Sequence, residues 1–134
     1  MDTRRGLQIA VALLGIVALV AGAVGVVWGA ALVQGAGSYS PSVDNELRFF
    51  AAWYATAGVL VLRTVPRIEA HRDTLRVVCI AVFVAACGRV VSLVTVGVPD
   101  TLYVVLMVVE FALPAVLLPW HAAVLRRPGS KDGL

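Results

Sequence analysis

The sequence predicts an all-α integral membrane protein, a bundle of four transmembrane helices with both termini in the cytoplasm. Its 134 residues are 60% hydrophobic and only 14% charged, and the mean hydropathy is +0.93. A soluble domain carries roughly twice that charged fraction. Four long apolar segments alternate with polar connections, and each is close to the ~20 residues that cross the hydrocarbon core of a bilayer. We therefore expect one transmembrane domain, because no separate soluble catalytic domain fits in this length.

The first predicted span covers residues 7–33, which contain no charge and a single amide side chain. It follows a basic start but is far longer than the apolar region of a signal peptide, which indicates a retained membrane anchor. Gly22, Gly25 and Gly29 recur along it at helical spacing. Gly25 and Gly29 form a GxxxG pattern, which allows another helix to approach closely.

The second predicted span covers residues 45–62, after a loop rich in Gly, Ser and Pro at residues 35–42. Asp44 is expected to cap this helix, and Glu46 is favourably placed in its first turn. The span is short and carries two charges at its start. We therefore expect its first residues to lie near the membrane surface.

The third and fourth predicted spans cover residues 75–98 and 101–125 and are joined by a tight turn. Asp100 is expected to cap the fourth helix. Pro114 lies inside that helix, where it cannot donate a hydrogen bond to the carbonyl four residues earlier. Residues 126–134 form a polar C-terminal tail outside the bundle.

The positions of the basic residues predict the topology. Nine of the 11 fall before the first span, between the second and third, or after the fourth, whereas the other two connections carry none. Because basic residues concentrate on the cytoplasmic side, this alternation favours four spans and cytoplasmic termini. We expect the protein in a bacterial cytoplasmic (inner) membrane.

Two charged residues, Arg89 and Glu110, lie deep within predicted spans, far from the span ends. An ionisable side chain in hydrocarbon costs about 2.5–3.5 kcal/mol on insertion scales, so each of them needs a partner, a water-filled cavity or a function. Counted from the shared turn, both lie roughly 12–14 Å below the membrane surface at 1.5 Å per residue. We predict that they form a buried ion pair between the third and fourth helices.

Further polar groups are expected near this pair. Tyr54 of the second span reaches a similar depth, and Ser92 lies one helical turn from Arg89 on the same face. The cluster has three interpretations: it only fixes helix packing, it forms a ligand, lipid or proton site, or its charges pair with a different chain. Glu46 and Arg48 either cap and anchor the second helix or line a mouth to the cluster.

Several functional classes lack support in the sequence. His71 and His121 have no second His, Cys or carboxylate at ligand spacing, so we expect no metal site. Cys79 and Cys87 lie about 12 Å apart along a helix, beyond disulfide reach. No cofactor motif, catalytic set or nucleic-acid motif occurs. We expect neither an enzyme nor a protein that binds a cofactor or nucleic acid.

The chain resembles a family of small bacterial four-helix membrane proteins known as domain of unknown function 4345. The resemblance covers nearly the whole chain and rests on three short stretches, one acidic residue and a basic pair. Residues 45–49 (NELRF) open the second helix, and residues 88–93 (GRVVSL) with 97–99 (GVP) lie in and after the third. Glu110 lies inside the fourth helix, before the basic pair at 126–127.

The resemblance implies the four-helix fold and a constellation of Arg48, Arg89 and Glu110, but it implies no defined function. The chain departs from the family at residues 49–52, where FFAA replaces a small Thr-Tyr-Gly-Gly stretch. Two functions remain open at this point. The first is an accessory or structural subunit that packs against other membrane protein subunits. The alternative is a module that binds or transports a lipid or small amphipathic molecule through the polar cluster.

Overall fold

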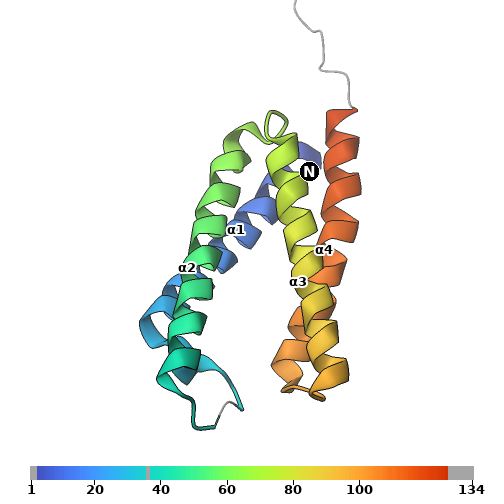
Figure 1. Cartoon of the computed structure of the whole chain (residues 1–134). Helices are drawn as coiled ribbons and strands as arrows, with labels where there is room; N and C mark the ends of the chain where they lie inside the picture. Colours follow the sequence, from blue (N-terminus) through green and yellow to red (C-terminus); the bar gives the residue numbers. More distant parts are fainter. Residues whose placement is uncertain (1–2, 36, 127–134) are drawn as a thin grey trace, which may run out of the picture.

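The computed structural model describes residues 3–35 and 37–126, and this part of the chain is entirely helical outside its connections. The elements are α1 Thr3–Trp28, the 3-10 helix η1 Gly29–Leu32, α2 Pro41–Thr64, the 3-10 helix η2 Val65–Arg67, α3 Arg72–Thr95 and α4 Thr101–Leu125. All four α-helices are long and apolar enough to cross a membrane. The chain is therefore a multi-pass membrane protein, folded as a four-helix bundle (Figure 1).

The second helix begins earlier than the sequence pattern predicted. It starts at Pro41, and its N-cap is Ser40, whose Oγ accepts a hydrogen bond from the Val43 amide at 3.3 Å. Proline suits the first helical position, because it needs no amide hydrogen there and its φ is already helical. The prediction that Asp44 caps this helix is therefore wrong: Asp44 lies in its first turn.

The other boundaries differ from the prediction by a few residues. The first helix ends at Trp28 and continues only as a 3-10 turn, and the third covers Arg72–Thr95 in place of residues 75–98. The fourth helix has the predicted bounds, and its cap Asp100 accepts a hydrogen bond from the Leu102 amide at 3.1 Å. Of the predicted tail, only Arg126 lies within the described residues.

Helices α1 and α2 form the closest pair in the bundle, because glycine lets their backbones touch. A Cβ atom on Gly22 would lie 2.3 Å from the Ala55 nitrogen, and one on Gly58 would lie 2.4 Å from the Leu19 nitrogen. Gly25 similarly faces the Ala51 side chain. Small residues at such crossings are the usual means by which membrane helices gain van der Waals contact. Gly22 and Gly25 thus pack within the chain itself.

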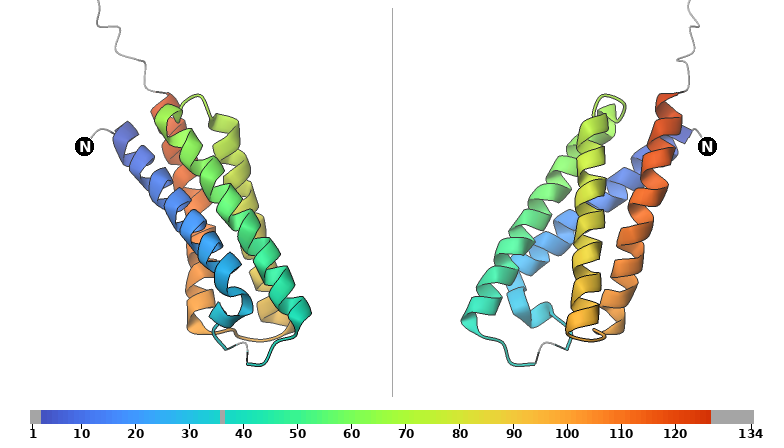
Figure 2. Two further views of the ribbon diagram at one scale, coloured as in Figure 1. Left: turned by 90° about the vertical axis from the view of Figure 1, so that its left-hand side faces the viewer. Right: turned by 45° about the vertical axis from the view of Figure 1, so that its right-hand side comes forward.

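Helix α1 crosses the bundle diagonally and joins the two helix pairs (Figure 2). Its second half lies along α2, whereas its start lies beside α4. At that start the Trp120 ring covers Gly6, and Trp120 Nε1 donates a hydrogen bond to the Thr3 carbonyl at 3.2 Å. The crossing brings all four helices together at one end of the molecule.

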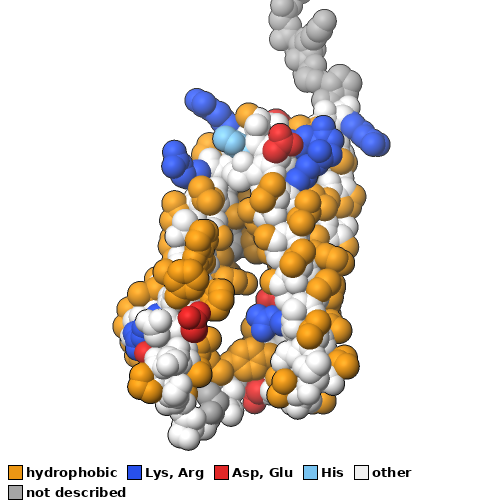
Figure 3. Space-filling model, viewed as in Figure 1, with side chains coloured by type: hydrophobic (Ala, Val, Ile, Leu, Met, Phe, Trp, Pro, Cys, Tyr) orange, Lys and Arg blue, Asp and Glu red, His pale blue; other side chains and the backbone are white. Residues whose placement is uncertain are grey.

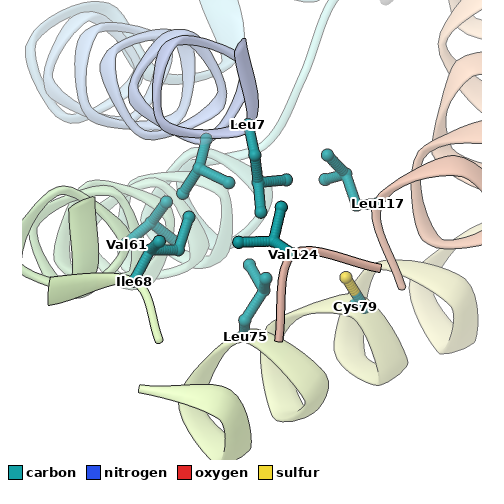
Figure 4. Packing of buried hydrophobic residues seen from close by; sticks show 8 residues of the cluster. Leu7, Val61, Ile68, Leu75, Cys79, Leu117 and Val124 are labelled. Atoms are coloured by element: carbon teal, nitrogen blue, oxygen red, sulfur yellow. The ribbon is translucent and has the colours of Figure 1, made fainter. Parts of the chain in front are cut away.

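That end is the packed part of the bundle, and we call it the basic end. Figure 3 shows blue Arg side chains gathered there, while the opposite end, the loop end, holds residues 33–35, 37–40 and 96–100. The apolar core lies at the basic end and draws on all four helices and on the connection after α2 (Figure 4). Its buried members are Leu7, Val11, Val61, Ile68, Leu75, Cys79, Leu117 and Val124.

Two polar side chains fix the connection between α2 and α3 to the other helices. Gln8 Nε2 donates to the Val65 carbonyl at 2.8 Å. His121, which is 2% exposed, donates from Nε2 to the Ile68 carbonyl at 3.0 Å. Because backbone carbonyls near hydrocarbon need donors, these bonds satisfy the groups that a non-helical connection exposes. His121 therefore has a structural role, which its neighbours in the sequence did not indicate.

An ion pair between Arg4 and Glu69 adds a link between α1 and this connection. The hydrogen bond from Arg4, followed by the Glu69 backbone amide, holds the pKa of the Glu69 carboxyl below its usual value. The associated stabilisation is present above the ordinary carboxyl pKa and is lost as the pH falls through the lowered one. Both side chains are about 40% exposed, so this contribution is small, in the range of about 0–1 kcal/mol.

Candidate functional site: the cleft between the helix pairs

Toward the loop end the pair α1–α2 separates from the pair α3–α4. The apolar core that joins the pairs lies at the basic end, and few close contacts connect α2 with α3 or α1 with α4 elsewhere. Figure 3 shows an opening between the pairs at this level, with acidic and basic side chains on its walls. We call this opening the cleft.

The charged group on the α3–α4 wall is the Arg89–Glu110 ion pair. Arg89 Nε donates to Glu110 Oε2 at 2.7 Å, and Arg89 Nη2 donates to Glu110 Oε1 at 3.0 Å. This two-bond geometry is the strong form of an arginine–carboxylate contact. The Glu110 side chain is only 9% exposed, whereas that of Arg89 is 35% exposed. The pair is therefore anchored by a buried carboxylate and presents part of its guanidinium to the cleft.

Pro114 lies one helical turn after Glu110 and is buried in α4. The helix runs through this proline without a break in its assignment. Since proline has no amide hydrogen, it leaves the Glu110 carbonyl without its usual helical donor. A backbone acceptor is thus released beside the carboxylate. The ring of Pro114 is itself buried in the bundle, and its helix-packing role stays a prediction.

The other predicted members of the cluster lie near the pair but do not bond to it. Tyr54 of α2 lies close enough to interact electrostatically with both Glu110 and Arg89. Its hydroxyl has no hydrogen bond to any residue that the structure describes, and neither does the Ser92 hydroxyl. Residues 3–35 and 37–126 therefore contain a charged pair with separate hydroxyl groups around it, in place of a four-membered network.

A cavity of about 210 Å³ extends from Arg89 toward the loop end. Arg89, Ser92 and Leu93 of α3 line one side of it, and Tyr103 and Met107 of α4 line the other. The ligand sites of drug-sized molecules measure roughly 300–1,000 Å³. This cavity is smaller, so it matches a head group better than a whole molecule.

The cleft is closed at the loop end by the connection between α1 and α2. The Gln34 amide donates to the Tyr103 hydroxyl at 3.2 Å, which joins the two helix pairs. With the core at the basic end and this contact at the loop end, the way into the cleft is from the side, between the pairs. In a membrane that side faces the bilayer.

Asp44 and Arg48 form a second polar group at the end of α1. Gly29 has a φ of +56°, which ends the α-helix and turns the Ala30 amide away from the Val26 carbonyl. Asp44 accepts that amide at 2.9 Å, and Arg48 Nη1 donates to the Val26 carbonyl at 2.6 Å. The two side chains also bond each other, at 2.7 Å. They replace the broken helical hydrogen bond with a side-chain bridge.

The bridge shows how Gly29 and Arg48 are placed. A Cβ on Gly29 would lie 2.1 Å from Asp44 Oδ1 of α2, so Gly29 allows α2 to approach closely, at the turn where the α-helix of α1 ends. Of the two alternatives for Arg48, its contacts support capping, at the end of α1 and not of its own helix. Glu46 is exposed and makes no ion pair with any residue in the described ranges.

The change Arg48→Gln is expected to loosen the end of α1. It removes the donor from the carbonyls of Val26 and Val27. Each lost hydrogen bond to a charged group costs up to about 3 kcal/mol. Amide hydrogen exchange near Trp28 should accelerate about tenfold or more. Arg63→Gln removes the same charge from the same helix and serves as control, since Arg63 has no hydrogen bond to a described residue. Equal exchange in both variants would contradict the capping role.

Within the described residues no group of three or more His, Cys, Asp or Glu side chains is arranged to hold a metal ion. Cys79 is buried in the core and Cys87 is exposed, and both are free thiols. The residues that sequence reasoning missed are Tyr103 and Gln34, whose contact joins positions 69 apart in the chain. No local pattern carries such a signal.

Comparison with known proteins identifies one family. The model of the family described as Domain of unknown function (DUF4345) matches residues 6–121. The matched range includes most or all of each of the four helices and every residue of the cleft named above. No curated protein and no solved structure matches the chain.

Proposed function

We propose that this chain, which belongs to the DUF4345 family, binds the polar head of an amphipathic, lipid-like molecule in its cleft. The family is described as a domain of unknown function, so membership itself defines no role. The proposal depends on one observation: the partly exposed Arg89–Glu110 pair lies on the wall of an opening between the helix pairs. A charged pair that only fixed helix packing would gain nothing from facing this opening. The bound molecule would enter from the bilayer, with its apolar part remaining among the lipids.

The hydrogen-bonding groups of the cleft indicate the chemistry of that head. A guanidinium has five N–H groups, and Arg89 uses two of them on Glu110. The other three, together with the hydroxyls of Tyr54 and Ser92, have no acceptor among the described residues. The Tyr103 hydroxyl accepts one bond and still has its own hydrogen to donate. Donors are therefore in excess, and they favour a head rich in acceptors, such as a carbonyl, ester or phosphate oxygen.

The accessory-subunit function stays a second prediction. It depended on small-residue faces that could pack against partner helices, but Gly22, Gly25 and Gly58 are occupied by the contact between α1 and α2. The contact between α1 and α2 therefore weakens the case for the accessory-subunit function. The geometry still allows a partner helix to pack in the cleft, and the experiment below distinguishes such a helix from a bound lipid-like molecule.

The arrangement of charges supports the proposed orientation. Seven arginines of the described residues lie at the basic end, and the connections at the loop end carry none. By the positive-inside rule we place the basic end in the cytoplasm of a bacterial cell and the cleft in the outer leaflet of its cytoplasmic membrane. The proposed role is binding or transport, and not catalysis.

The test is to purify the full chain from its native membrane in mild detergent and identify bound small molecules in an organic extract by mass spectrometry. The variant Tyr54→Phe with Ser92→Ala removes two cleft hydroxyls and leaves the ion pair intact. Each lost hydrogen bond is worth about 0.5–1.5 kcal/mol, so the amount of the retained molecule should fall at least about fivefold. Wild type should retain a molecule enriched over bulk lipid.

A matched control is Tyr39→Phe with Ser38→Ala, which makes the same chemical changes at two exposed residues in the connection between α1 and α2, away from the Arg89–Glu110 pair. This control should retain as much of the molecule as wild type. Equal losses in both variants, or no enriched molecule in wild type, would contradict the binding function. A second polypeptide in fixed ratio would support the subunit function in its place.

A further inference from the structure

A second cavity lies at the basic end, on the other side of the core from the cleft. It measures about 260 Å³ and lies between the start of α3 and the end of α4. Arg72 and Arg76 line its outer part, and Ile80, Leu118 and Leu125 line it with apolar surface. His121 forms its wall, with Nε2 committed to the Ile68 carbonyl. We call this cavity the basic pocket.

The two arginines of the basic pocket carry uncompensated charge. Arg72 and Arg76 are one helical turn apart on α3 and are both exposed. Neither forms an ion pair or a hydrogen bond with any part of the chain that the structure describes. The nearest acid in sequence, Asp73, does not line the pocket. The nearby carboxylate of Glu69 is already bonded to Arg4. An anion in this pocket would therefore meet two guanidinium groups without displacing an existing partner.

The position of the pocket indicates that its ligand has an apolar part as well as an anionic group. Arg72 and Ile80 are eight residues apart, which is about 12 Å along a helix. Arg72 is the first residue of a membrane-spanning helix, so the arginines lie at the level of lipid head groups and Ile80 lies within the acyl region. A free anion would leave the apolar part of the pocket unused. A phospholipid would place its phosphate between the arginines and the start of an acyl chain below them.

We infer that the basic pocket binds the phosphate of an anionic phospholipid, with Arg72 and Arg76 as the ligands and Ile80, Leu118 and Leu125 contacting its chain. Basic pockets between transmembrane helices on the cytoplasmic side are a recognised form of lipid-specific recognition. The inference is independent of the cleft, because it involves other residues at the opposite end of the bundle.

Native mass spectrometry tests this site on the full chain in an uncharged detergent with added phosphatidylglycerol or phosphatidylcholine of equal chain length. A salt concentration of about 0.3 M screens diffuse attraction between exposed charges. Wild type should retain phosphatidylglycerol in preference to phosphatidylcholine. In Arg72→Gln with Arg76→Gln, the affinity for phosphatidylglycerol should fall at least about tenfold, because two charge-assisted contacts are lost.

The matched control is Arg63→Gln with Arg67→Gln, which removes the same charge from the same end but outside the pocket. Its affinity should stay within about twofold of wild type, and circular dichroism should show equal helicity in both variants. Equal losses in the two variants would assign the effect to net charge and overturn the inference, as would equal binding of the two lipids. Displacement of the lipid by an equimolar amount of inorganic phosphate would also overturn it, since the anion alone would then account for binding.

Discussion

Replacing Glu110 by leucine is expected to destabilise the protein by about 3 kcal/mol, close to the low end of the cost of breaking a buried ion pair. The change leaves the Arg89 guanidinium without its two acceptors, and an arginine cannot lose its charge at any pH a protein tolerates. The 35% exposure of Arg89 to the cleft keeps the cost near that low end. The measurement is reversible unfolding in mixed micelles, followed by circular dichroism.

Arg89→Leu is expected to cost less, about 1–3 kcal/mol. It leaves the buried Glu110 carboxylate unpaired, but a carboxylate can become neutral by taking up a proton. The double variant Arg89→Leu with Glu110→Leu should unfold within about 1 kcal/mol of wild type, because apolar residues often replace a buried pair without loss. Losses that simply add in the double variant would contradict direct coupling between the two residues.

The double variant also separates stability from function. If the pair only fixes helix packing, a stable double variant should behave as wild type does in every respect. The binding function instead requires that it loses the retained amphipathic molecule while keeping its fold, since the guanidinium donors are gone. Retention of that molecule by a folded double variant would show that the pair does not take part in binding.

Gly22→Ala is expected to destabilise the bundle by about 2–3 kcal/mol, near the upper end of ordinary overpacking. The new Cβ would lie 2.3 Å from the Ala55 nitrogen and 2.6 Å from the Ala51 carbonyl oxygen. Both are backbone atoms of α2, which cannot rotate away as a side chain can. Helices α1 and α2 therefore have to separate along the contact.

Gly88→Ala provides the control for this prediction. Gly88 also lies in the interior of a helix, but a Cβ there would meet no atom within 4 Å. Alanine is favoured over glycine in a helix by roughly 0.5–1 kcal/mol, so this variant should be slightly more stable than wild type. The two unfolding curves should move in opposite directions. A shift of Gly22→Ala in the same direction as the control would contradict the close contact between α1 and α2.

The helices and the charged pair could be predicted from the sequence because each depends on local information. Long apolar runs define the helices. The tight turn at residues 96–100 makes α3 and α4 antiparallel neighbours, which places Arg89 opposite Glu110 by counting residues alone. The Asp100 cap could be predicted because aspartate directly before a helix is a local signal. The start of α2 was missed although its signal was present, because Ser40 and Pro41 are typical N-cap and first-turn residues.

The cleft and its surroundings could not be predicted, because they depend on which helices pack together. The pattern at Gly22 and Gly25 showed that a helix could approach, but not that Gly58 of the same chain would meet it. The role of Arg48 depends on where Gly29 ends α1, which hydrophobicity does not reveal. The opening between the helix pairs follows from the diagonal path of α1, a property of the whole bundle.

The mass of the intact particle tests the central claim most directly. Native mass spectrometry of the protein extracted from its own membrane reports, in one measurement, the polypeptides and the small molecules that remain together. Binding in the cleft predicts a particle made only of the 14.1 kDa chain, once or in a whole-number multiple, with an acceptor-headed lipid-like molecule attached. A particle that holds a second polypeptide in fixed ratio, and no such molecule, would contradict it.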